Sequence, residues 1–160
     1  MIVIADTTPL NYLIVIGCID ALPSLYTHVI IPSSVQNELL HANAPVEVRD
    51  WMSQPPSWME VRSPLKISDP ALLKLDAGKR DAIALAEELN AQLLIVDELK
   101  GRRIAEERGL AVVGTIGVLR DAASLGLIDI KSALDRLSRT TFHLSPGLVE
   151  RLVKKSEFPG

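Results

Sequence analysis

Two aspartates of this chain directly follow apolar runs. Asp6 comes after residues 2–5, and Asp97 comes after residues 93–96. Runs without polar alternation are typical of strands covered on both faces, and open α/β sheets bind ligands at the carboxyl ends of such strands. Both aspartates are therefore predicted to lie where ligands bind. For Asp6 a second interpretation stays open, in which the carboxylate only caps the helix that follows.

Glu98 follows Asp97 at once, and neighbouring side chains diverge in direction. At most one of this pair is expected to point inward with Asp6. Asp97 is favoured as the inward-pointing acid because it ends the apolar run, and Glu98 is the alternative.

Two further acids border the apolar stripes of predicted helices. Glu38 lies three residues after Val35, and Asp81 lies four residues before Leu85 in a predicted helix over 79–90. These spacings place each acid at the rim of a buried face. The alternatives are a solvated surface glutamate for Glu38 and compensation of the helix dipole for Asp81. Asp76 is either a helix terminator or an extra acid, and ranks lower.

Four carboxylates in one place would repel one another strongly unless a cation neutralised them. Mg²⁺ and Mn²⁺ prefer oxygen ligands and usually keep waters and substrate phosphate oxygens in their shell. Such an ion activates a water molecule and stabilises the charge on a displaced phosphodiester oxygen. The sequence thus predicts that the carboxylates of Asp6, Glu38, Asp81 and Asp97 converge on one cleft with one or two ions.

Five short β-rich runs alternate with helical stretches, which favours an α/β fold with a mainly parallel sheet covered by helices. The predicted strands are residues 2–5, 28–31, 59–62, 93–96 and 111–113. Thr8 and Pro9 suit the cap and first turn of the helix after Asp6. Residues 1–160 show no internal repeat and are predicted to form a single domain.

Composition excludes several classes of protein. With 48% hydrophobic and only 4% aromatic residues, the chain can bury an aliphatic core but lacks the aromatic platform of a base-stacking RNA module. One cysteine, Cys18, rules out an intrachain disulfide and a cysteine-rich zinc site. A net charge of −3 argues against binding nucleic acid by bulk charge, although neutralised metal ligands would change that balance. No apolar stretch is long enough for a bilayer, so a cytoplasmic protein without membrane contact is expected.

These segments resemble the PIN-domain nucleases, whose pattern is an opening strand with Asp-Thr or Asp-Ser, a helical Glu and two later acids. The matching segments are Ile4-Ala5-Asp6-Thr7-Thr8-Pro9-Leu10, Ile31-Pro32 leading to Glu38-Leu39, Asp81-Ala82-Ile83-Ala84-Leu85-Ala86, and Leu94-Ile95-Val96-Asp97. They cover roughly residues 1–120. The chain is most similar to a prokaryotic subgroup of predicted nucleic-acid-binding PIN proteins, which also shows segments like 101–105 and 114–119.

The resemblance implies a three-layer α/β/α fold with a parallel sheet of about five strands, and Mg²⁺- or Mn²⁺-dependent endonuclease activity on RNA. Asp6 and Asp97 would be direct metal ligands, and Glu38 and Asp81 would complete the catalytic set. Many relatives are toxins of toxin-antitoxin pairs, inhibited by a small protein, and many form homodimers. Both kinds of partner are therefore expected here. The alternative is a PIN fold that binds RNA or a protein without turnover.

Hydroxyl groups beside Asp6 and positive residues beside the later acids could hold RNA phosphates. The predicted substrate contacts are Thr7, Thr8, Lys79, Lys100, Arg102 and Arg103. The alternative for each cation is a solvated helix face.

The chain departs from the PIN pattern at two places. Leu99 stands where many PIN nucleases have another acid or polar ligand, which weakens the prediction of a second metal ion. Lys79 stands where relatives in the subgroup often have Glu. The part after about residue 127 extends beyond the usual core as helices, with packing or dimerisation as its expected role.

Other phosphate-processing enzymes fit the sequence less well. Haloacid-dehalogenase-like phosphatases need a second Asp two residues after the first, and that residue is Thr8 here. A response-regulator receiver would need paired acids after its first strand. A glycine-rich phosphate loop is absent there as well, which disfavours nucleotide binding of the P-loop or Rossmann kind.

Overall fold

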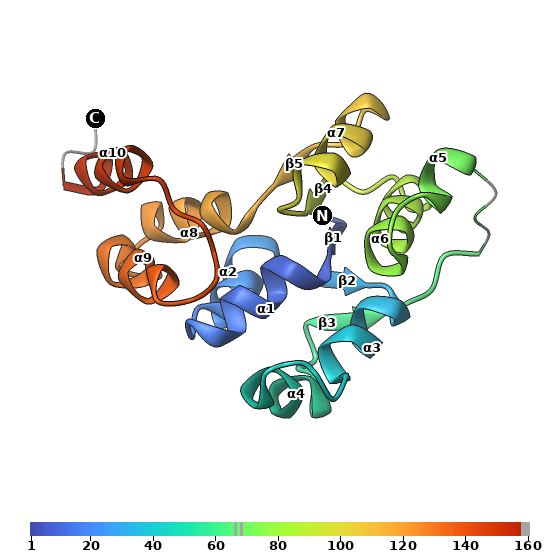
Figure 1. Ribbon diagram of the computed structural model, residues 1–160, viewed down its shortest axis with the longest axis horizontal. Helices are drawn as coiled ribbons and strands as arrows, with labels where there is room; N and C mark the ends of the chain where they lie inside the picture. Colours follow the sequence, from blue (N-terminus) through green and yellow to red (C-terminus); the bar gives the residue numbers. More distant parts are fainter. Residues whose placement is uncertain (66, 68, 158–160) are drawn as a thin grey trace.

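A parallel five-stranded sheet lies at the centre of the computed structural model, which describes residues 1–65, 67 and 69–157 (Figure 1). The strand order is β3-β2-β1-β4-β5, and each neighbouring pair is parallel. The strands are β1 (Val3–Ala5), β2 (Val29–Ile31), β3 (Met59–Val61), β4 (Leu93–Ile95) and β5 (Val112–Val113). All five predicted strands are present, each within a residue or two of its predicted bounds.

Helices join the strands. Within the described residues they are α1 (Thr7–Val15), the 3-10 helix η1 (Ile19–Ala21), α2 (Leu22–Tyr26), α3 (Ser33–Leu40), α4 (Val46–Ser53), α5 (Pro70–Leu73), α6 (Ala77–Glu88), α7 (Leu99–Glu107), α8 (Thr115–Ser124), α9 (Ile130–Ser138) and α10 (Pro146–Glu157).

The sheet separates two helical layers because successive strand residues point to opposite faces. Val3 and Ala5 pack into a core with side chains of α1 to α4 and α8 to α10. Ile4, between them, packs into a second core with α5, α6 and α7. In Figure 1 the helices α5 and α6 lie on the far side of the sheet from α8 to α10. The predicted three-layer α/β/α fold is confirmed.

The strand order reverses direction at β1. The chain runs outward from β1 to β2 and β3, then returns to the other side of β1 with β4 and β5. In such sheets the crevice outside the carboxyl ends of the two strands at the reversal is the usual ligand site. Asp6 follows β1, and its backbone N–H donates to the carbonyl of Ile95 at the end of β4 at 3.0 Å. Topology thus brings the ends of both apolar runs together.

Helices α1, α6 and α7 each begin two residues earlier than the sequence predicts, α7 at Leu99 and not at residue 101. Helix α1 starts at Thr7, so Asp6 and not Thr8 occupies its N-cap position, yet the Asp6 side chain makes no capping hydrogen bond. Helix α6 starts at Ala77, because Asp76 caps it by accepting a hydrogen bond from the Lys79 backbone N–H at 3.1 Å. Asp81 therefore lies in the second turn of α6, and compensation of the helix dipole falls to Asp76.

The C-terminal helices pack on the same core as α1. Ile130, Ala133, Leu134 and Leu137 of α9 are buried in it, and the segment after α9 touches α1 through a 2.8 Å hydrogen bond between Tyr12 and Thr141. Residues 158–160 of the predicted domain lie outside the described residues. In the described part of the chain, no single helix has both the length and the apolar content that crossing a bilayer needs. Helix α1 reaches that length and apolar content only when it is taken together with η1 and α2, from which a 113° bend separates it.

Candidate active site

Asp6 and Glu38 meet against Gly78, the second residue of α6. A Cβ atom placed on Gly78 would lie 2.7 Å from Glu38 Oε1, closer than real Cβ contacts come, and 3.2 Å from Asp6 Oδ1, tighter than most of them. Glycine at this position lets helix α6 approach both carboxylates. Three elements distant in sequence, the end of β1, α3 and α6, thus build one acidic pair.

Asp6 is buried, with only 1% of the residue exposed, and its Oδ2 atom has no hydrogen-bond partner among the described residues. The pKa of Asp6 is raised from 3.8 to about 6, chiefly by burial. Lys79 and a hydrogen bond with the Thr7 backbone lower it, and the negative charges of Asp76 and Glu38 add to the rise. An unsatisfied buried carboxylate oxygen is costly to a fold. Asp6 therefore serves something other than stability.

Lys79 carries the positive charge nearest to Asp6. Its Nζ lies 2.9 Å from Asp76 Oδ2, 2.9 Å from Glu98 Oε2 and 3.9 Å from Asp6 Oδ2, and its side chain is 9% exposed. Burial lowers the pKa of Lys79, but the bonds to Glu98 and Asp76 outweigh that effect and the net pKa is raised. The ammonium is directed into the acids, and the predicted contact of Lys79 with RNA phosphate stays a prediction.

Asp97 and Glu98 diverge, as their adjacency predicts. Both oxygens of Asp97 accept hydrogen bonds from Thr115 at the start of α8, one from the backbone N–H at 2.7 Å and one from the hydroxyl at 2.6 Å. Glu98 instead reaches Lys79. The acid linked to Asp6 through the lysine is thus Glu98, while Asp97 binds the neighbouring helix.

Asp81 lies three residues after Gly78, one turn further along the same face of α6. Its side chain is 12% exposed, and Oδ1 accepts a 3.0 Å hydrogen bond from Arg80. Within the described residues, no three His, Cys, Asp or Glu side chains are placed to share one metal ion. The predicted four-carboxylate ligand set is not assembled; the structure brings together Asp6 and Glu38.

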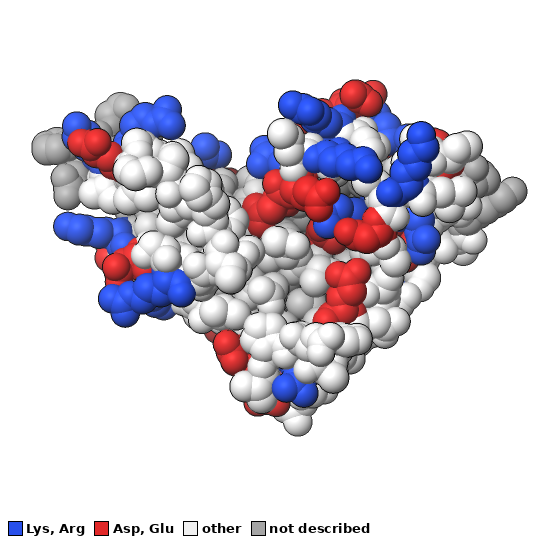
Figure 2. All heavy atoms as spheres, in the orientation of Figure 1, with Lys and Arg blue, Asp and Glu red and all other residues white. Residues whose placement is uncertain are grey.

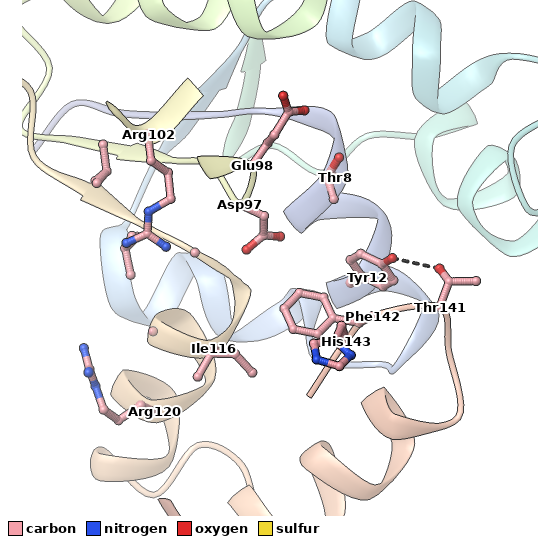
Figure 3. Close-up of a pocket in the computed structure, with 14 residues that line it drawn as sticks. Thr8, Tyr12, Asp97, Glu98, Arg102, Ile116, Arg120, Thr141, Phe142 and His143 are labelled. Atoms are coloured by element: carbon pink, nitrogen blue, oxygen red, sulfur yellow. Dashed lines mark hydrogen bonds between the residues drawn. The ribbon is translucent and has the colours of Figure 1, made fainter. Parts of the chain in front are cut away.

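An open cleft of about 590 Å³ is lined by Asp97 and Glu98, and Asp97 points into it (Figure 3). Glu98 and Arg102 line one side. Tyr12 and Phe142 line the other, packed edge to face with ring centroids 5.0 Å apart. A second, smaller hollow of about 420 Å³ is lined by residues that include Thr7 and Glu38.

Of the remaining predicted substrate contacts, three line one of the two hollows and two lie outside them. Thr8 and Arg102 line the larger cleft, and Thr7 lines the smaller hollow. Lys100 and Arg103 lie exposed on α7 outside both. In Figure 2, acidic side chains gather near the middle of this face with basic side chains beside them.

Sequence reasoning missed part of the cleft wall. Arg120, Phe142 and His143 line it but belong to α8 and to the segment before α10, far along the chain from Asp6. Tyr12 could have been predicted, because it lies four residues after Thr8 and therefore on the same face of α1. Asp76 and Glu98 were considered only as secondary acids. Their pairing with Lys79 requires the three-dimensional placement of α6 against α7.

A divalent ion fits the Asp6–Glu38 pair. The orphaned Oδ2 of Asp6 is a free oxygen ligand, and no hydrogen bond or ion pair engages the Glu38 carboxylate within the described residues. Mg²⁺ is commonly bound through one or two carboxylates, with waters and substrate phosphates completing its shell. The donor set therefore suits one ion.

Comparison with known families decides the identity of this fold. The family model DUF3368, described as a PIN domain, matches residues 2–157. The chain belongs to the PIN-domain family. No curated protein and no solved structure matches it significantly. PIN domains are commonly nucleases and generally use divalent metals, which agrees with an acidic site at the switch point of the sheet.

Substituting Gly78→Ala should disable the site of this PIN domain without unfolding it. The new methyl group would displace the Glu38 carboxylate, a flexible chain end, while alanine favours the helix by about 1 kcal/mol. We expect weaker Mn²⁺ binding, measured by calorimetry, and an unchanged or higher melting temperature. Gly147→Ala in α10 is the matched control, because a Cβ atom there meets nothing within 4 Å. Equal metal affinity in the two variants would argue against the pairing at Gly78.

Substituting Asp97→Ala should destabilise the PIN fold by about 2 kcal/mol, since it leaves a fully buried Thr115 without partners for its N–H and hydroxyl. Asp97→Asn keeps an acceptor and should cost about 1 kcal/mol or less. Urea denaturation measures both. Equal losses in the two variants would show that the charge of Asp97, and not its hydrogen bonds to α8, stabilises the protein.

Proposed function

We propose that this PIN domain is a divalent-metal-dependent endoribonuclease. The observation that carries the proposal is Asp6, a buried carboxylate with one unpartnered oxygen, which meets the free carboxylate of Glu38 at Gly78, at the reversal point of the sheet. PIN domains are commonly nucleases, which supports phosphodiester hydrolysis as the use of this acidic pair.

In this mechanism Asp6 and Glu38 would hold one Mg²⁺ or Mn²⁺ ion. When bound, such an ion supplies activation of a water molecule and neutralises charge on the phosphate. Glu38, which is exposed, is positioned to accept a proton from the attacking water. The hydroxyl of Thr7, buried and without a hydrogen-bond partner among the described residues, can donate to a phosphate oxygen.

The cleft lined by Asp97 and Glu98 suits a single RNA strand. Arg102 and Arg120 line it and provide guanidinium groups for phosphates. Tyr12 and Phe142 offer aromatic surface for one base, which is the sequence-tolerant form of single-strand recognition. The exposed Lys100 and Arg103 would add charge along α7. This arrangement supports binding of an RNA strand that passes the acids.

The test is cleavage of a mixed pool of single-stranded RNA with Mn²⁺ or Mg²⁺, in parallel with excess chelator and with the Asp6→Asn protein. We expect cleavage only by the wild-type protein with metal. Attack by water leaves no 2′,3′-cyclic phosphate, so the product ends separate this reaction from that of a contaminating metal-independent ribonuclease. Cleavage that persists in chelator or in Asp6→Asn would refute the mechanism.

One observation favours a second function, the binding of RNA or protein without turnover. The ammonium of Lys79 already neutralises part of the negative charge of the acidic site. The site therefore needs a metal ion less than four unpaired carboxylates would. Absence of cleavage of any RNA with Mn²⁺, together with retained RNA binding in chelator, would support that alternative.

The proposal includes partners taken from the PIN resemblance. A small antitoxin-like protein would inhibit the nuclease, and two copies of the chain would form a homodimer. Light scattering coupled to size-exclusion chromatography measures the mass of the particle, and a mass of one chain would exclude the homodimer under those conditions.

A further inference from the structure

The ammonium of Lys79 is a built-in cation of the acidic site. The side chain is almost completely buried, and the carbons of its stem pack along Gly101 of α7, where a Cβ atom would lie 3.4 Å from Lys79 Cδ. The ammonium bridges Asp76 at the start of α6 and Glu98 at the start of α7. Lys79 is therefore held in place by two helices and cannot swing out to solvent without breaking both contacts.

The charges around Asp6 are unbalanced. Asp6, Glu38, Asp76 and Glu98 are four acids, and Lys79 is a cation that contacts three of them, Asp6, Asp76 and Glu98. Asp76 and Glu98 each have a short contact with the ammonium, whereas Asp6 Oδ2, 3.9 Å away, has no hydrogen bond among the described residues. Asp6 Oδ2 is thus left as a free ligand atom, and the other oxygen, Oδ1, lies with Glu38 Oε1 beside Gly78.

We propose that Lys79 takes the place of a second metal ion, so that the site binds a single divalent ion at Asp6 and Glu38. We infer that ion from the buried, unpartnered oxygen of Asp6. The ammonium supplies the positive charge for the acids on the α6–α7 side. This inference rests on the metal site of the proposed function, but it does not depend on RNA being the substrate.

The test compares Mn²⁺ binding by calorimetry in the wild-type protein, Lys79→Met and Glu98→Gln. Wild type should bind one ion. Lys79→Met removes one positive charge near the ion and should tighten its binding by about tenfold or more, whereas Glu98→Gln should weaken it by a similar factor. Lys131→Met, which removes an exposed charge on α9, is the matched control and should leave the affinity unchanged.

Thermal unfolding is the second readout. Without metal, Lys79→Met leaves the acids uncompensated, so its melting temperature should fall by about 5 °C or more, and saturating Mn²⁺ should restore it. Two ions bound by wild type would overturn the inference, as would an unchanged or weaker affinity in Lys79→Met. If Lys79→Met folds neither with nor without Mn²⁺, an affinity in Glu98→Gln equal to that of wild type overturns it. A wild-type protein that binds no Mn²⁺ refutes the metal site itself.

Discussion

Substituting Asp6→Asn should abolish RNA cleavage and make the metal-free protein more stable. The rate should fall by at least about 10²-fold, the loss typical when one preorganised electrostatic contact to a transition state is removed. The unfolding free energy at pH 7 should rise by about 3 kcal/mol, because the buried carboxylate, whose pKa is raised to about 6, is held ionised there at a cost. Single-turnover kinetics and urea denaturation measure the two effects.

The opposite signs of these two changes make the prediction specific. Asp50→Asn, an exposed aspartate on α4, is the matched control and should change neither quantity. A structural role for Asp6, such as capping α1, predicts instead that Asp6→Asn lowers the stability. Loss of both activity and stability would therefore show that Asp6 has a structural role and that another carboxylate is the catalytic one.

The stability of the metal-free protein should fall as pH rises from about 4 to about 6 through the effect of Asp6. Its pKa is 3.8 in the unfolded chain and about 6 in the fold, so within this window the folded state binds more protons than the unfolded state. Linkage then lowers the unfolding free energy as pH rises, by about 3 kcal/mol in all, and the effect ends above the folded pKa.

The measurement is the difference in unfolding free energy between wild type and Asp6→Asn at several pH values, because the other titrating groups largely cancel in that difference. Asp76, whose pKa is lowered despite the opposing effect of burial because it bonds with Lys79, contributes stability that is lost at lower pH in both proteins. A difference that stays constant between pH 4 and 6.5 would contradict the burial of an unpartnered Asp6. Saturating Mn²⁺ should reduce the decline in the wild-type protein.

The fold could be predicted from local sequence because its strands carry strong signals. Uninterrupted apolar runs before Asp6 and Asp97 gave both the parallel sheet and the position of its crevice. The pairing of Asp6 with Glu38 followed from the same logic, since helix spacing placed Glu38 at the rim of the core. Gly78 allows the two carboxylates to lie close together, and nothing in the sequence pattern marks this glycine as part of the site.

The direction of side chains at the site could not be predicted. Asp97 and Glu98 are adjacent, and only the contact of Asp97 with Thr115 on α8 decides which one turns toward Lys79. The interior position of Lys79 depends on how α6 packs against α7, and a sequence pattern does not contain that contact. Phe142 reaches the cleft only because the chain after α9 returns to α1.

The most direct test of the account is equilibrium Mn²⁺ binding to the wild-type protein, Glu38→Gln and Glu47→Gln. Glu47 is an exposed glutamate on α4, the helix after Glu38, and serves as the matched control. We predict one ion bound by wild type and by Glu47→Gln, with affinity lost by about tenfold or more in Glu38→Gln, because one of two carboxylate ligands is gone. Binding to Glu38→Gln that equals wild type would contradict the proposal that Asp6 and Glu38 form the metal site.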